Sequence, residues 1–392
     1  MSDTRTSPGR RPPEGCPTSD LDPWADEVLR DPYPMSGGLR QQGAVVWLQR
    51  YGLAALPRFE QVRAALADWR TFSSAEGVAA GDRGNGRVRS NVIASDPPLH
   101  SEYRRPLADQ LSSTALGAFT DDIHATAHWF AERIAETGSF DAVADLARPY
   151  SLQVVADMVG LPHDAREMYP DLAARSFDVM GPDNRRSKDG LSGLADLEQT
   201  TAAHCQRLEP GLLGDRLYQS GRPELVAAYT WPGIDTTVNA LGAAMYLFAA
   251  HPDQWEAVCA DRSLIPSAFN EVLRMHAPVH YFTRVVTEDA DVDGVVLPEG
   301  TRVLIMYGSA NRDEREFPDP DRFDVTRHPV RQLAFGRGVH LCVGINLARL
   351  EAHALLDALA DRVRGFTPAG EPRWMVNNTL HGLASLPVRA LR

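Results

Sequence analysis

One of the four cysteines of this chain lies in a loop that suits a metal ligand. Cys342 belongs to the segment 335–344 (FGRGVHLCVG), which directly precedes a helix expected from Ile345. Only a thiolate binds metal well, and the free N–H groups and positive dipole end of that helix favour the charged sulfur. The glycines let the backbone turn tightly and approach a flat ligand, while Phe335 can exclude water from the sulfur. The alternative is a buried, inert cysteine.

A carboxylic acid and an alcohol stand side by side within a long helical segment. Asp235-Thr236 follows Pro232-Gly233, and a proline there removes one backbone donor and clashes with the preceding turn, which predicts a kink. An acid beside a hydroxyl is suited to carrying protons into the groove that a kink opens. The alternative is that Thr236 caps a helix break while Asp235 forms a surface ion pair.

The elements that must position these residues are mostly helical. Helical apolar periodicity dominates residues 100–260, and further helices are expected at 59–69 and 345–364. Residues 77–91 are rich in glycine and arginine, so they are predicted to form a loop.

Short strand-like segments occur toward both ends of the chain. They are 44–48, 51–56, 284–286, 295–297 and 303–306. The predicted fold class is therefore mainly α with small β-sheets. We expect one domain over residues 21–392, preceded by a polar, proline-rich and disordered tail over residues 1–20.

Composition excludes several classes of partner. The 392 residues carry a net charge of −12, which argues against nucleic acid, because phosphate binding needs basic stripes. No apolar run approaches the roughly 20 residues that span a bilayer. The four cysteines are far apart, so zinc sites and disulfides are not expected. These features predict a soluble, cytoplasmic protein, and we expect a monomer.

The cysteine loop resembles the haem-binding signature of cytochromes P450. It matches that signature at every defining position, including Phe335, Gly336 and Gly344. The resemblance is to the soluble, bacterial class I enzymes and covers the chain from about Asp22 to Pro387. It implies the cytochrome P450 fold, with haem b between a kinked distal helix and the proximal cysteine loop, and Cys342 as the axial iron ligand.

The same resemblance implies partners for the two propionates of haem. A buried carboxylate demands cationic or hydrogen-bonding groups. His100 and Arg104 are one helical turn apart, Arg284 lies in the strand region, and His340 precedes the cysteine by two residues. All four match propionate-binding positions of the family.

Two further sets of residues take roles from the resemblance. Glu271 and Arg274 share a helix face, and with Arg322 they would form the buried triad that braces the proximal side of the haem. Asp235 would recruit the protons that reductive O₂ cleavage needs, while Thr236 steadies iron-bound oxygen and a water. Electrons would come from NAD(P)H through a ferredoxin or flavodoxin-like protein and its reductase.

Several segments are similar to bacterial cytochromes P450 that demethylate para-methoxybenzoate. The element Arg87-Val88-Arg89-Ser90 fits their carboxylate-holding Arg-x-x-Ser, so Arg87 and Ser90 are candidate substrate contacts. Other candidate contacts are Trp231, Phe282 and Phe177. The serines that those enzymes place on the distal helix are absent, with Ala228 and Trp231 in that region.

The sequence therefore predicts a monooxygenase that demethylates or hydroxylates a small methoxylated aromatic, either a benzoate or a phenol. One alternative is a hydroxylase of another small hydrophobic molecule, such as a natural-product intermediate. Another is a peroxide-driven haem-thiolate peroxygenase, and a third is a non-enzymatic haem carrier or sensor. The Asp235-Thr236 pair counts against the last two, because neither needs a proton relay.

Overall fold

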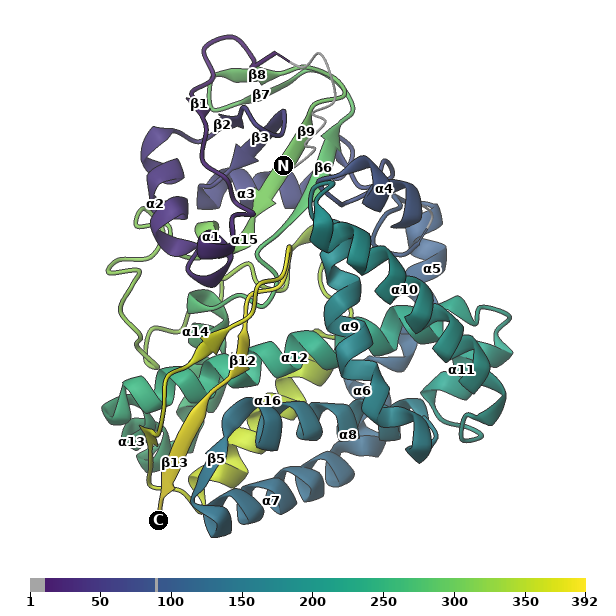
Figure 1. The fold of residues 1–392 in the computed structure, drawn as a ribbon, viewed down its shortest axis with the longest axis vertical. Helices are drawn as coiled ribbons and strands as arrows, with labels where there is room; N and C mark the ends of the chain where they lie inside the picture. Colours follow the sequence, from purple (N-terminus) through teal and green to yellow (C-terminus); the bar gives the residue numbers. More distant parts are fainter. Residues whose placement is uncertain (1–10, 89–90) are drawn as a thin grey trace.

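The computed structural model describes residues 11–88 and 91–392, and helices form most of it (Figure 1). The longer helices are α5 (Leu99–Gln110), α7 (Thr120–Thr137), α8 (Arg148–Val159), α9 (Tyr169–Phe177), α10 (Arg185–His204), α12 (Glu224–Ala250), α13 (Pro252–Ala260), α14 (Ile265–Met275) and α16 (Ile345–Ala360). The shorter ones are α1 (Asp26–Arg30), α2 (Tyr33–Gln42), α3 (Phe59–Ala67), α4 (Asp82–Val88), α6 (Ser113–Leu116), α11 (Leu213–Gln219) and α15 (Tyr307–Ala310).

Helix α12 crosses the centre of the helical region (Figure 1). Helix α12 itself carries apolar and small residues on nearly all of its faces, and it is buried over most of its length. It packs against α8, α9, α14 and α16. It ends at Ala250 because His251 precedes Pro252, and a residue before proline is disfavoured in the helical conformation. A helix that is buried over most of its length thus carries Asp235 and Thr236.

The largest sheet has six strands in the order β1-β2-β3-β9-β6-β4. These strands are β1 (Thr18–Ser19), β2 (Val46–Leu48), β3 (Leu53–Leu56), β4 (Phe72–Ser73), β6 (Tyr281–Val286) and β9 (Arg302–Met306). The pairs β1–β2 and β3–β9 are parallel and the others are antiparallel. The sheet joins residues 18–73 to residues 281–306, because β9 pairs with β3 on one side and with β6 on the other.

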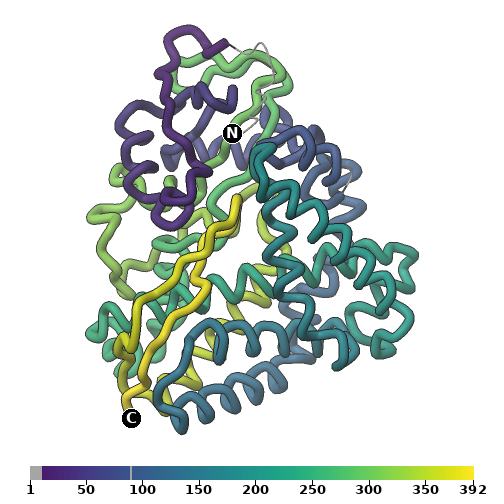
Figure 2. Tube along the Cα trace, viewed as in Figure 1, coloured from purple at the N-terminus to yellow at the C-terminus, as the bar shows by residue number. Residues whose placement is uncertain are grey.

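Three smaller sheets complete the fold. Strand β13 (Pro387–Leu391) lies between β10 (Gly365–Pro368) and β5 (Ser139–Asp141), and antiparallel pairs join β11 (Arg373–Trp374) to β12 (Leu383–Ser385) and β7 (Ala290–Val292) to β8 (Val295–Leu297). The C-terminal segment runs from the N-terminal sheet region along the helical region (Figure 2). No described helix combines the length and apolar character that a membrane crossing requires.

Most predicted elements are present, with two corrections. The predicted tail 1–20 was too long, because Thr18 and Ser19 pair with Trp47 and Leu48 as strand β1; residues 1–10 lie outside the described residues. The predicted loop 77–91 contains helix α4, within which Gly84 and Asn85 are buried. Close packing of Gly84 against the Val179 backbone explains why a glycine-rich segment can be helical there.

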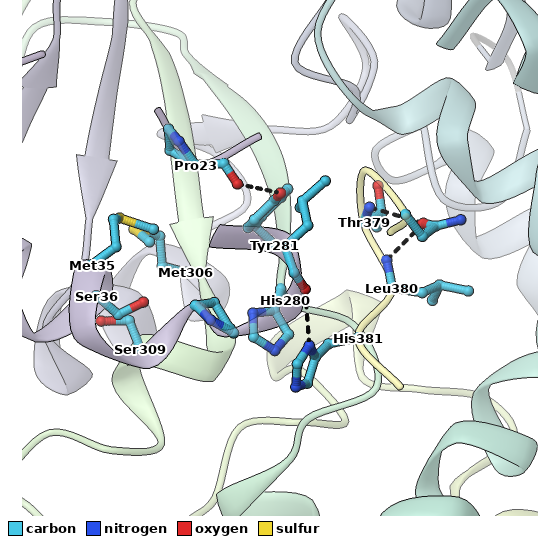
Figure 3. Close-up of a pocket in the computed structure, with 13 residues that line it drawn as sticks. Pro23, Met35, Ser36, His280, Tyr281, Met306, Ser309, Thr379, Leu380 and His381 are labelled. Carbon is cyan, nitrogen blue, oxygen red and sulfur yellow. Dashed lines mark hydrogen bonds between the residues drawn. The ribbon is translucent and has the colours of Figure 1, made fainter. Parts of the chain in front are cut away.

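Three buried histidines join the segment 276–280 to the C-terminal segment of the chain. His276, His280 and His381 lie near one another, with His381 stacked on Trp374 at 4.6 Å between ring centroids and at 4.6 Å from His280. Figure 3 shows His280 and His381 beside a cavity of about 10 Å³ that Met35 and Thr379 also line. We call His276, His280 and His381 the histidine cluster.

Candidate functional site

A cavity of about 260 Å³ lies between helix α12 and the cysteine loop. Helix α12 contributes Ala228, Tyr229 and the residues from Trp231 to Thr237 other than Ile234 and Asp235, and the loop contributes Ala334, Phe335, Gly336 and the residues His340 to Gly344. The structure thus brings together the two segments singled out in the sequence, although the intervening chain from residue 237 to residue 334 separates them.

The cysteine loop holds its sulfur by backbone geometry. The Cys342 N–H donates to the Phe335 carbonyl oxygen at 2.8 Å, and both Gly336 and Gly338 have φ near +70°. A Cβ on Gly338 would collide with the Leu66 carbonyl oxygen. Burial raises the pKa of the Cys342 thiol, while the Gly344 N–H and the positive charge of Arg104 act to lower that pKa.

The four predicted propionate partners converge beside this loop. The rings of His100 and His340 are 4.3 Å apart, and Arg104 donates to the Leu341 carbonyl oxygen. Arg284 is buried and acts electrostatically on His340. All four line the cavity, so a basic rim borders the cysteine.

This rim tests whether haem would fit. Among the described residues, the buried Nε2 of His100 has no hydrogen-bond partner, and the buried Nε2 of His340 has only the Asp96 carboxylate 3.9 Å away. Burial lowers the pKa of His100 to about 4. Buried orphan polar atoms and arginines beside a cavity suit a bound acidic group. Because the cavity also contains a cysteine at a helix N-terminus, its residues fit haem with its two carboxylates.

Across the cavity, Thr236 faces in and Asp235 lies behind it. Helix α12 runs through Pro232 without interruption, and the Thr236 hydroxyl donates to the Pro232 carbonyl oxygen at 2.7 Å. Asp235 does not line the cavity, and its buried Oδ2 has no hydrogen-bond partner within the described part of the chain. Burial raises the pKa of Asp235 to about 7, against the positive charge of Arg148. Arg148 and Asp171 form an exposed ion pair at 2.7 Å.

The predicted brace contains a different second arginine. Glu271 and Arg274 are fully buried and paired at 2.7 Å. Arg327, not Arg322, makes the second ion pair with Glu271, at 3.0 Å. Arg322 is exposed and pairs with Asp324 at 3.4 Å, and it offers only its carbonyl oxygen to Arg274.

The candidate substrate contacts divide into two groups. Phe177, Trp231 and Phe282 line the cavity as predicted. Arg87 does not: it is exposed and forms an ion pair with Glu198. Its predicted role as a carboxylate clamp is not supported, because its charge is already compensated outside the cavity. Ser90 lies outside the described residues.

Sequence reasoning missed a second buried acid at this site. Glu351 on α16 lines the cavity, and neither of its carboxylate oxygens has a hydrogen-bond partner among the described residues. Burial raises its pKa well above the usual range. The signal was available, because Glu351 falls between Leu347 and Leu355 on the apolar stripe of its helix.

Comparisons with known proteins agree with this geometry. Residues 224–390 match the family model described as cytochrome P450. The chain is 38% identical to cytochrome p450 CYP199A2 of Rhodopseudomonas palustris over 96% of this chain and 95% of that protein. It is 31% identical to the cytochrome P450 monooxygenase PikC of Streptomyces venezuelae, over 95% of this chain and 94% of that protein.

Solved structures show the same fold. CYP109E1 from Bacillus megaterium, in complex with testosterone, superposes with a TM-score of 0.82 at 26% identity, covering 93% of this chain and 99% of that chain. CYP108D1 from Novosphingobium aromaticivorans gives 0.81 at 26% identity, covering 93% and 96%. The chain therefore belongs to the cytochrome P450 family, whose members are haem monooxygenases that use O₂ and electrons from NAD(P)H delivered by redox partners.

Proposed function

We propose that this protein oxidises a small methoxylated aromatic molecule, by O-demethylation or ring hydroxylation, with electrons from a ferredoxin or flavodoxin-like donor. The observation that carries the proposal is that Cys342 and Thr236 line the same cavity, together with apolar and aromatic side chains. Haem bound there supplies the oxidising chemistry, and the remaining steps fall to the residues of this chain.

In this proposal, Cys342 would be the protein ligand of the haem iron. The N–H of Gly344 and the charge of Arg104 stabilise its thiolate and offset the cost of burial. His100, Arg104, Arg284 and His340 would hold the two propionates, which would give the buried Nε2 of His100 the hydrogen-bond partner that no described residue offers it. Glu271, Arg274 and Arg327 have no place in the reaction and brace the segment before the loop.

Protons would reach the cavity through Asp235 and Thr236 on α12. The exposed Arg148–Asp171 pair is close enough to act on the charge of the buried Asp235, and Thr236 lines the cavity. A carboxyl group with a pKa near 7 can both take up and release a proton at neutral pH. This retained acid–alcohol pair favours O₂ over peroxide as the oxidant.

A spectroscopic and product assay tests the proposal. The reduced, CO-treated holoprotein should absorb near 450 nm, as a thiolate ligand requires, and Cys342→Ser should abolish that band. Uncharged and acidic methoxyaromatics should convert the ferric protein from low to high spin. NADH with a ferredoxin and its reductase should then release formaldehyde or a hydroxylated product. Turnover with hydrogen peroxide alone, equal to that with the electron donors, would contradict the proposal.

A further inference from the structure

We infer that the substrate part of the cavity selects an uncharged, flat aromatic ring and discriminates against the corresponding carboxylate. The inference rests on the proposed function and narrows its substrate class. It follows from where the charges of the lining residues are placed, from the environment of Trp231 and from one free amide donor.

Most charged residues of the lining are grouped around the cysteine loop. His100, Arg104, Arg284 and His340 gather at the cysteine loop, where they contact or act on one another and on Leu341. Glu351 lies on α16. The other described walls are uncharged, and they are formed chiefly by Val78, Val92, Ile93, Phe177, Val279 and Phe282.

Trp231 presents a fixed aromatic face to this region. Its indole Nε1 donates to the Ala173 carbonyl oxygen at 2.9 Å, and its ring lies 4.7 Å from that of Phe177 between centroids. With its one donor already used, the side chain can offer only its π-face and edge. An aromatic ring whose donor is already used can stack with a flat ring but gives an anion no hydrogen bond.

Asn91 supplies the polar contact. It lines the cavity, and its Oδ1 accepts from the N–H groups of Ile93 and Ala94 at 3.0 and 3.1 Å. These two bonds fix the orientation of the amide, and its Nδ2 donates to no described residue. One neutral N–H donor suits an ether, carbonyl or phenol oxygen, whereas a buried carboxylate needs more compensation than one amide can give.

Arg87 provides the control. Its ion pair with Glu198 at the surface compensates the charge that a substrate carboxylate would otherwise use. Because Arg87 does not line the cavity, its removal should leave the affinity for every probe unchanged.

The test compares two probes of nearly equal size. The ferric holoenzyme is titrated with 4-methoxybenzamide and 4-methoxybenzoate at pH 7.5, and the low-to-high-spin shift gives each dissociation constant. We expect the amide to bind at least about tenfold more tightly, since burial of an uncompensated carboxylate costs more than burial of an amide. Asn91→Leu should weaken binding of the amide about tenfold and leave 4-methylanisole unaffected. Arg87→Ala should change neither constant.

The outcomes separate the two proposals. Equal or tighter binding of the benzoate would overturn the inference and leave the monooxygenase assignment intact, and so would a loss of benzoate binding in Arg87→Ala. If none of the two probes and 4-methylanisole produced a spin shift, that result would instead count against the aromatic substrate class itself. Folding of each variant is checked by the height of its reduced-CO band.

Discussion

At the scale of single residues, Asp235 shows how burial prepares a group for proton transfer. Its carboxyl is buried, the next residue in the sequence is the cavity-lining Thr236, and the charges of the exposed Arg148–Asp171 pair act on that carboxyl. The pKa of Asp235 is raised to about 7 because burial disfavours its charged form. Near neutral pH the group is therefore divided between protonated and ionised forms, which suits a relay.

Asp235→Asn should lower turnover by about 10² or more, because general acid–base groups contribute on that order. Substrate affinity, read from the spin shift, should change little, and the inflection near pH 7 in the rate profile should disappear. Asp171→Asn removes a negative charge that raises the pKa of Asp235, so its inflection should move to lower pH. An unchanged profile in both variants would refute the relay.

The brace around Glu271 offers a comparison of two nearby arginines. Arg327→Ala leaves a fully buried carboxylate with one partner fewer and should reduce the free energy of unfolding by about 2 kcal/mol. Arg322→Ala removes an exposed ion pair and should change it by less than about 0.5 kcal/mol. Urea unfolding of the holoprotein measures both. A larger loss in Arg322→Ala would restore the brace predicted from sequence.

These residues also mark what the sequence could not determine. Arg322 and Arg327 are five positions apart in irregular backbone, where no periodicity shows which side chain turns inward. The partner of Arg87, Glu198, is 111 residues farther along the chain. Cys342, by contrast, was identifiable because glycine spacing and the following helix are local properties.

At the scale of elements, the cysteine loop is built by two glycines in the left-handed region. Gly338→Ala should disrupt the loop, because the new Cβ meets the Leu66 carbonyl oxygen as well as an unfavourable φ of +70°. Gly336→Ala meets only the φ cost of about 1 kcal/mol, since its new Cβ would lie in ordinary contact with the His340 carbonyl oxygen, 3.6 Å away. The absorbance near 450 nm per mole of protein should fall much further in Gly338→Ala than in Gly336→Ala; equal losses would contradict this account.

Predicting the elements from sequence succeeded where one face had a clear periodicity. Strand 295–297 was predicted with its observed bounds, and α16 was predicted from Ile345, four residues longer than observed. Helix α4 was missed because its glycines oppose helix formation locally, whereas packing of Gly84 against Val179 favours it. Helix α12 continues through Pro232, so the proline does not end the helix that carries Asp235 and Thr236.

At the scale of the whole molecule, the histidine cluster makes stability depend on pH. Burial lowers the pKa of His381 to about 4 and those of His276 and His280 well below their usual value. The unfolded chain binds protons to these histidines below about pH 6.5, and the folded chain does not. The stability they contribute is therefore complete above pH 6.5 and falls as pH drops toward 4, by about 1.4 kcal/mol per pH unit for each histidine.

His381→Gln should reduce the slope of the free energy of unfolding against pH by the contribution of one histidine. Thermal unfolding between pH 4.5 and 7.5 measures it, with His163→Gln, at the exposed start of η3 (His163–Met168), as the matched control. Asp178 and Asp235, whose pKa values are raised to about 7, act in the opposite direction over the same range. The difference between the variants therefore isolates the cluster, and parallel curves for all three proteins would exclude its role.

The position of β13 has a consequence for synthesis. This strand is the middle member of its sheet, so β5, which ends at Asp141, finds its partner only after residues 387–391 have been made. Trp24 likewise donates to the carbonyl oxygen of Asn378, 354 residues away. During translation the early segments therefore expose unpaired strand edges and apolar surface until the C-terminal residues have been made. Chaperones recognise chains in this condition. Recombinant yield should accordingly respond more to slower growth or added chaperone than to changes near the cavity.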